Sequence, residues 1–173
     1  MENIIRGKVW VGRDNIMAYE IVIKWDMDKI DQEELGDQAM EGVDPVFMGK
    51  KGAFKNGGYS IVAAGANFGG GGKSIVHPIY ALRGAGVKLV LAESFGRFNY
   101  KNSINNGMPA LVCPGILEFA QTGDELAVDI AGGTVANLSS GKSIPIAPIP
   151  EFIRNVVAEG GLIPYTKNRL NPK

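Results

Sequence analysis

A buried strand and a glycine-rich turn follow each other in Tyr59-Ser60-Ile61-Val62-Ala63-Ala64 and Gly65-Ala66-Asn67-Phe68-Gly69-Gly70-Gly71-Gly72-Lys73-Ser74. The first six residues are mostly apolar and are followed by glycine, which is typical of a strand covered on both faces. Beyond the turn, Ile75, Ile79 and Leu82 share one face of a helix, and Pro78 fits only in its first turn. The segment therefore predicts a strand, a turn and a helix.

The same order repeats downstream. Residues Val87 to Ala92 are apolar apart from Lys88 and predict a second buried strand. We expect Ser94 to cap a second helix that runs to Asn106-Gly107, and Pro109 to Cys113 to form a third strand. Strands that alternate with helices indicate a parallel sheet with right-handed crossovers, so the predicted fold class is α/β.

The flanking regions predict shorter elements. Upstream, β-branched and aromatic residues favour strands at Lys8 to Val11 and at Glu20 to Trp25, and Ile30 to Leu35 favours a short acidic helix. Downstream, Glu125 to Ala147 reads as short β segments separated at Gly132-Gly133 and at Ser139-Ser140-Gly141.

A last helix is predicted from Pro150 to Gly160-Gly161. Its pattern is expected to bury Phe152, Ile153, Val156 and Val157.

Composition limits the classes of function. The 173 residues fit one domain spanning 1–173, and 18 basic against 18 acidic residues give a net charge of zero. Such a chain has no long-range field to attract nucleic acid or an anionic membrane surface. The sequence contains no run of about 20 apolar residues and no signal-peptide pattern at its start, so a cytoplasmic location is expected.

Cys113 and His77 are the only cysteine and histidine. They cannot hold a structural zinc ion or an iron–sulfur cluster, which need several such ligands, so no metal site is predicted. A catalytic Cys/His pair is formally available, but Cys113 lies in the apolar run Ala110-Leu111-Val112-Cys113, which favours a core residue.

The four glycines followed by Lys73-Ser74 suggest an anion site, because backbone N–H groups at a helix start, an ammonium and a hydroxyl would meet there. A nucleotide-binding P-loop needs a glycine five residues before Gly72, and this chain has Asn67 there. Nucleotide hydrolysis is therefore disfavoured.

Several linked motifs follow in a fixed order. They are Gly7-Lys8-Val9-Trp10 with Asp14-Asn15-Ile16, Asn67-Phe68-Gly69 with His77, Ala81-Leu82 with Gly84-Ala85-Gly86-Val87, Ala92-Glu93-Ser94-Phe95 with Arg97, Tyr100-Lys101-Asn102 with Ile104-Asn105-Asn106-Gly107, and Gly160-Gly161-Leu162-Ile163. Over essentially the whole chain they resemble the small-subunit family of 3-isopropylmalate dehydratases, the swivel domain of the aconitase superfamily. The resemblance implies a swivelling β/β/α domain that closes over a large subunit. That partner would carry a [4Fe-4S] cluster, and this chain would bind none.

In that family the sequence after Asn-Phe-Gly is usually Cys-Gly-Ser-Ser-Arg-Glu-His. There a serine is the base, and the arginine binds a substrate carboxylate. Anchored on His77, the present chain has Lys73 and Ser74 at the two serines and Ile75 at the arginine. The family's early Asp-Thr-Asp is replaced by Met17-Ala18-Tyr19. The resemblance therefore implies that the substrate is a hydroxy di- or tricarboxylate such as a substituted malate. The departures from the family's sequence leave the exact compound open.

The implied reaction adds or removes water on that substrate. The cluster iron of the partner would act as a Lewis acid on the leaving hydroxyl, and Ser74 is the candidate base. Lys73 either favours the alkoxide of Ser74 or binds a substrate carboxylate in place of the arginine. The expected substrate-binding residues are Asn67, Gly70, Gly71, Gly72, His77, Arg97, Lys24 and Trp25.

Three alternatives stay open. His77 can be a packing or capping residue, and Arg97 can pair with Glu93 four residues away. The whole chain can also be a non-catalytic swivel module that only stabilises or regulates a large subunit.

Overall fold

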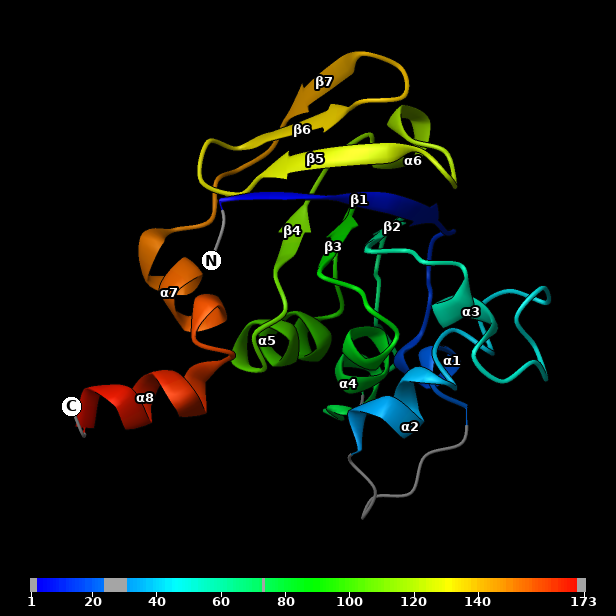
Figure 1. Ribbon diagram of the computed structural model, residues 1–173, viewed down its shortest axis with the longest axis horizontal. Coiled ribbons are helices and arrows are strands. Elements are labelled where there is room, and N and C mark those ends of the chain that lie inside the picture. Colours follow the sequence, from blue (N-terminus) through cyan, green and yellow to red (C-terminus); the bar gives the residue numbers. More distant parts are fainter. Residues whose placement is uncertain (1–2, 24–30, 73, 171–173) are drawn as a thin grey trace.

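The structure, a computed structural model, describes residues 3–23, 31–72 and 74–170. Its described part contains a seven-stranded sheet in the order β4-β3-β2-β1-β5-β6-β7 (Figure 1). The strands are β1 (Ile4–Val11), β2 (Ile61–Ala64), β3 (Leu89–Ala92), β4 (Ala110–Val112), β5 (Glu125–Asp129), β6 (Thr134–Asn137) and β7 (Lys142–Pro145). The helices are α1 (Ala18–Ile21), α2 (Gln32–Gly36), α3 (Ala53–Asn56), α4 (His77–Gly84), α5 (Arg97–Asn105), α6 (Ile116–Phe119), α7 (Glu151–Ala158) and α8 (Leu162–Leu170).

The sheet has a parallel half and an antiparallel half that share β1. Strands β1 to β4 pair in parallel, with Val9 opposite Ile61 and Ala92 opposite Val112. On its other edge β1 pairs antiparallel with β5, and β6 and β7 follow as hairpins. Pairing with β5 extends β1 back to Ile4, four residues before the predicted start at Lys8.

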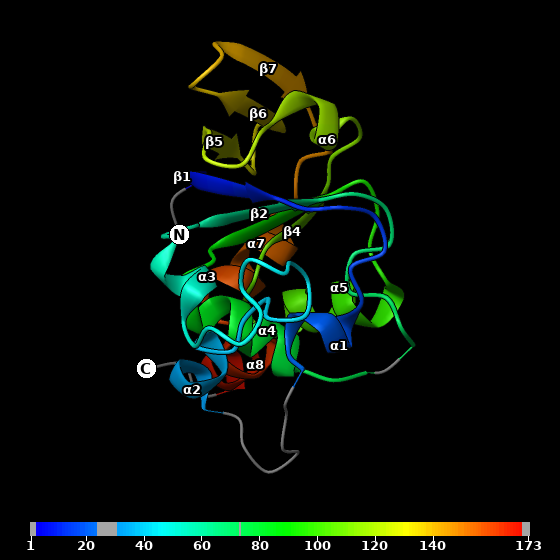
Figure 2. The same ribbon diagram turned by 90° about the vertical axis from the view of Figure 1, so that its right-hand side faces the viewer.

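The sheet curls, so that three layers form. Helices α2 and α4 cover one face of the parallel half, and β5 to β7 with α6 lie on the opposite side (Figures 1 and 2). Residues of alternate orientation on β2 belong to different cores: Val62 faces the helices, whereas Ile61 packs in one cluster with Leu126 of β5. This arrangement confirms the α/β fold class and the β/β/α layers.

Glycines allow helix α4 to approach α2 closely. A Cβ on Gly84 would lie 1.6 Å from the carbonyl oxygen of Gln32, and one on Gly36 would lie 2.3 Å from the carbonyl carbon of Gly84. The backbones of the two helices are therefore in direct contact, and this holds the helical layer against the sheet.

Most predicted elements of the parallel half are confirmed. Strands β2, β3 and β4 lie where the apolar runs predicted them, and every residue of β2 and β3 is buried. Pro78 lies in the first turn of α4 as expected. The β segments downstream also separate at Gly132-Gly133 and at Ser139-Ser140-Gly141.

The strand predicted at Glu20 to Trp25 is wrong over its described residues, because Glu20 and Ile21 belong to helix α1. The Glu20 carboxylate accepts a hydrogen bond from the backbone N–H of Met17 (2.7 Å), and the N–H of Ala18 donates to Gly70 (3.0 Å). These contacts at the helix start favour a turn of helix over an extended chain. Trp25 lies outside the described residues.

Two details near the chain's helices are also corrected. Gly96, not Ser94, precedes α5 as its N-cap residue. Phe152 is 56% exposed although the periodicity predicted burial, whereas Val156 and Val157 are buried as predicted. The Phe152 ring packs edge-on against Tyr165 of α8, a helix that the sequence analysis did not predict.

No helix in the described part of the chain is long and apolar enough to cross a membrane.

Candidate functional site

The candidate site lies where the parallel strands end. The loops after β1, β2 and β3 continue to hydrogen-bond with one another beyond the strands. Asn15 N–H donates to Ala66 (2.8 Å), Gly69 N–H donates to Ile16 (2.7 Å), and Phe68 N–H donates to Ser94 (3.0 Å). The segment that opens the glycine run is thus held between its two neighbours. The carboxyl edge of a parallel sheet is the usual place for a ligand site in such folds.

Side chains reinforce this joint. An Asp14 carboxylate oxygen accepts from the N–H of Ala66 (2.6 Å), and the amide of Asn67 donates to the Asn15 side chain (3.0 Å). Asn67 N–H in turn donates to the Ser94 hydroxyl (2.9 Å). Asn15 and Asn67 both have positive φ, 53° and 59°, a conformation that asparagine tolerates better than most residues.

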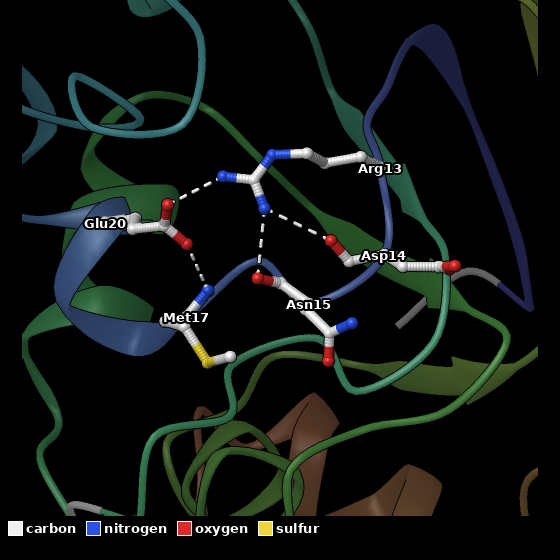
Figure 3. A network of polar contacts seen from close by, with 5 residues as sticks. All are labelled: Arg13, Asp14, Asn15, Met17 and Glu20. Atoms are coloured by element: carbon white, nitrogen blue, oxygen red, sulfur yellow. Dashed lines mark hydrogen bonds and ion pairs between the residues drawn. The ribbon is translucent and has the colours of Figure 1, made fainter.

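Arg13 and Glu20 brace the first of these loops (Figure 3). The Arg13 guanidinium donates to the carbonyls of Asp14 (3.1 Å) and Asn15 (3.0 Å) and pairs with Glu20 at 2.6 Å. Glu20 also accepts from Met17 N–H, as described above. The arginine therefore fixes the backbone of the residues whose side chains reach the glycine run. This role of Arg13 was not predicted from the sequence, although the residue directly precedes Asp14-Asn15.

The glycine run is shaped by close contacts and by positive φ. Gly69 has φ of 69°, and a Cβ there would lie 2.1 Å from Cγ of Asn99. Gly70 is buried, whereas Gly71 and Gly72 are exposed with φ of 101° and 72°. Among the described residues, the N–H groups of Gly71 and Gly72 find no hydrogen-bond acceptor. They remain available to a ligand.

Two helices start beside the run. Helix α4 begins at His77, three residues after Ser74, and α5 begins at Arg97. A Cβ on Gly96 would lie 2.7 Å from the carbonyl oxygen of Gly69, so the start of α5 touches the glycine run. Neither helix has a side-chain cap or an acidic residue in its first turn. The N–H groups and the positive dipole ends therefore favour a negative charge here.

The structure brings together only part of the predicted site. Ser74 and Arg97 are exposed beside the run, and His77 is 3% exposed at the start of α4. In the described part of the chain, no ion pair joins Arg97 to Glu93, whose carboxylate accepts from Gly115 N–H (2.8 Å) instead. Lys73, Lys24 and Trp25 lie outside the described residues.

A polar network behind the run was not anticipated. The Asn102 amide donates to the carbonyl of Ile75 (3.0 Å), next to Ser74, and the Asn106 amide donates to the Asn102 carbonyl (2.8 Å). Tyr80 donates to the Asn106 side chain (3.2 Å), and Arg83 donates to the Asn106 carbonyl. The spacing of Asn102 and Asn106 on one helix face could have indicated this network.

The residues of this chain do not fit an iron–sulfur cluster. Within residues 3–23, 31–72 and 74–170, no three His, Cys, Asp or Glu side chains are placed to hold a metal ion. Burial, and after it the charge of Glu93, raises the pKa of the Cys113 thiol to about 12. Cys113 is fully buried and stays protonated near neutral pH, which confirms that it is a core residue.

Comparison with known proteins agrees with the motifs. Residues 9–114, from β1 through β4, match the aconitase C-terminal domain. The chain is 38% identical to the isopropylmalate/citramalate isomerase small subunit of Methanocaldococcus jannaschii, covering 98% of both chains. It is 41% identical to the 3-isopropylmalate dehydratase small subunit of Pyrobaculum calidifontis, over 96% of this chain and 99% of the relative.

A solved structure is similar over the same length. The crystal structure of 3-isopropylmalate dehydratase from Methanocaldococcus jannaschii superposes with a TM-score of 0.82 at 28% identity, covering 96% of this chain and 95% of that one. The named relatives are subunits of enzymes, so they support the hydro-lyase interpretation over the non-catalytic module.

Proposed function

Because the chain belongs to the family of aconitase-type small subunits typified by 3-isopropylmalate dehydratase, we propose that it acts with a large subunit to add or remove water on a hydroxy di- or tricarboxylate such as a substituted malate. The observation that carries the proposal is the contact of the uncapped start of α5 with the glycine run, in which Gly71 and Gly72 are exposed and after which the uncapped helix α4 begins. A substrate with several carboxylates needs such a concentration of N–H donors.

Binding of one substrate carboxylate is assigned to the glycine run. The free N–H groups of Gly71 and Gly72 donate hydrogen bonds to its oxygens, and the starts of α4 and α5 stabilise its charge. Arg97, exposed in the first turn of α5, is available to a second carboxylate. These groups orient the substrate relative to Ser74.

Proton transfer is assigned to Ser74. Its hydroxyl, as the alkoxide, takes a proton from the carbon next to the one that bears the substrate hydroxyl. The helix start that follows favours the ionised oxygen. Lys73 either adds to this effect or binds a substrate carboxylate. A [4Fe-4S] cluster is expected in the large subunit, where it would supply a Lewis acid for the hydroxyl. No residue of this chain is assigned to it.

The exposure of the site to solvent supports the proposal that a partner subunit covers it. Ser74 lies on the surface of this chain, so another chain is needed to exclude water from the reaction. Exposed aromatic side chains stand nearby: Tyr19, 54% exposed, packs beside Gly71, and Phe98, 44% exposed, lies in the first turn of α5. Exposed aromatic residues of this kind are enriched in protein interfaces.

The test compares two serine variants of the complex, prepared with the large subunit under anaerobic conditions. Ser74→Ala is expected to lower turnover by about a hundredfold while subunit association and thermal unfolding stay unchanged. Ser140→Ala, in an exposed turn of the antiparallel half, is the matched control and leaves turnover as it is. Equal turnover in both variants would move the base to Lys73 or to the large subunit.

Lys73→Met distinguishes the two roles given to that residue. If Lys73 binds a carboxylate, KM rises by about tenfold or more, because a charge-assisted contact is lost. If it favours the alkoxide of Ser74, kcat falls and the pH–rate profile moves to higher pH. No change in either constant would remove Lys73 from the site.

A further inference from the structure

A cleft of about 980 Å³ opens at the opposite edge of the sheet from the glycine run. It lies where β1 and β3 begin and where the chain enters β4. The candidate active site lies at the other ends of the same strands. The volume falls within the range of small-molecule sites in proteins.

The cleft concentrates positive charge. Its lining contains Arg6 of β1, Arg83 near the end of α4 and Lys88 just before β3, and none of the described lining residues is acidic. Among the described residues, no carboxylate pairs with any of the three, whereas Arg13, Lys51 and Lys55 all pair with acids. The whole chain has a net charge of zero, so the positive charge of these three cations is concentrated at the cleft and does not reflect the overall composition.

One of these cations is held in place by the fold. Arg83 is half-buried and donates to the backbone carbonyl of Asn106, directly before Gly107 in the cleft wall. Arg6 and Lys88 are exposed and free to turn towards a ligand. The cleft therefore combines one fixed guanidinium with two adjustable cations, which suits an anionic head group.

The remainder of the lining is largely apolar. Ile4 is 43% exposed to the cleft side of β1, and Met108 and Pro109 form part of the wall. An inorganic anion would leave this surface unused, and a neutral hydrocarbon would leave the cations unpaired. We propose that the cleft binds a small organic anion, a carboxylate or phosphate ester with a short apolar chain.

The probes separate the two parts of this proposal. Hexanoate carries both a head group and a chain, acetate carries only the head group, and hexanamide carries only the chain. Hexanoate is expected to bind the full chain at least about tenfold more tightly than either of the others, and added salt is expected to weaken it. Hexyl phosphate, tested beside hexanoate, identifies which head group is preferred.

Methionine methyl resonances in NMR spectra show where a probe binds. Met108 reports on the cleft, and Met17, whose Cβ would be 3.9 Å from a Cβ on Gly71, reports on the glycine run. Saturable shifts of Met108, on a curve that Met17 does not share, support the proposal. Shifts of Met17 alone would place the anion at the active-site edge and overturn it.

Variants provide the second test. Arg6→Gln with Lys88→Gln is expected to weaken hexanoate at least about tenfold, since two charged contacts are lost. Lys142→Gln with Lys167→Gln removes the same charge from exposed positions elsewhere and is expected to change binding less than about twofold. Arg83 is left intact because it belongs to the network behind the glycine run. If both double variants bind hexanoate as the unmodified chain does, the cleft is not the site.

Discussion

The parallel and antiparallel halves of the sheet differ in the edge at which their strands end. Helical crossovers join β2, β3 and β4, so each strand runs the same way and all their carboxyl ends meet at one edge. Hairpins join β5, β6 and β7, so their ends alternate between the two edges. Loops from distant parts of the chain therefore converge at the carboxyl ends of the parallel strands, and the glycine run lies there.

The two halves also differ in how they satisfy buried polar groups. In the antiparallel half, Asn137 is 1% exposed, and its amide donates to Phe119 (3.2 Å) and Asp124 (2.7 Å). Its oxygen accepts from the N–H groups of Ser139 and Ser140, both at 3.0 Å. In the parallel half, Asn99 is buried next to Gly69, and its side-chain oxygen Oδ1 has no hydrogen-bond partner among the described residues. The antiparallel network is complete, whereas donors and acceptors remain unused around the glycine run.

The largest difference in stability is expected between alanine substitutions at two glycines, one in each half of the sheet. In Gly65→Ala the new Cβ would lie 1.8 Å from the Asp14 carboxylate, so we expect a loss of more than about 3 kcal/mol of stability. Gly123→Ala, before β5, meets nothing within 4 Å and only places alanine at a φ of 102°, at a cost of about 1 kcal/mol. Denaturant unfolding measures both. Equal losses would show that crowding by Asp14 does not set the cost of the Gly65 substitution.

Asn137→Ala tests the completed network. Removing this amide leaves two backbone N–H groups without their acceptor and takes one of two donors from the Asp124 carboxylate, which keeps the N–H of Gln121 (3.0 Å). This loss is expected to cost about 2 to 3 kcal/mol. Turnover per folded complex should stay the same, because the network is far from the glycine run in the topology of the sheet. A large loss of turnover at full folding would contradict the separation of the two halves.

Asn102→Ala tests the network behind the glycine run. Loss of the bond to Ile75 frees the segment that carries Ser74, so kcat is expected to fall about tenfold with a smaller change in KM. Asn105→Ala, an exposed position on the same helix, is the control for helix propensity. Steady-state kinetics decides the matter: an equal fall of kcat in the control would reduce Asn102 to a structural residue.

Cys113, which follows β4 and packs in one core cluster with residues of β5 and β6, is expected to have a smaller, pH-dependent effect on stability. Its pKa rises from 9.0 to about 12 on folding, so its contribution is complete below pH 9.0 and is lost as pH rises from 9.0 to about 12. From pH 9 to pH 10 this loss is about 1 kcal/mol. Cys113→Ala should therefore show a flatter decline of unfolding free energy over this interval. Parallel declines in both proteins would assign the alkaline loss to other groups.

Local patterns were sufficient to predict the central elements. The apolar runs of β2 and β3 are buried at every residue, and Pro78 starts α4, because each signal depends on a few neighbouring residues. The same kind of pattern was misleading at Ile21, where β-branched neighbours suggested a strand. Contacts of Met17 with Glu20 and of Ala18 with Gly70 stabilise a helical turn there instead.

The candidate site at the glycine run and Ser74 stays a prediction, made because the composition of this segment is unusual for a structural turn. The structure adds the contacts that hold the segment in place. The partners of Asn67 were not identifiable, since Asn15 is 52 residues away and Ser94 is 27 residues away in the chain. Asn102 was overlooked for the same reason, since Ile75 is 27 residues away. The contacts of Arg13 are local, but no motif in the sequence marked them.

The sequence by itself determined that this is an α/β chain of the aconitase-type small subunits, with a glycine-rich turn after β2 and too few cysteines and histidines for a cluster. Composition and the order of motifs carry that information without reference to distance in space. The tertiary structure alone decided which side chains brace the glycine run, that Glu20 caps a helix, and that Arg6, Arg83 and Lys88 surround one cleft. The contacts between the loops and the grouping of the three cations depend on crossovers that bring residues dozens of positions apart into contact, and local propensity carries no record of them. The bond between Met17 and Glu20 is local, but it accompanies the bond of Ala18 to Gly70 in a distant loop.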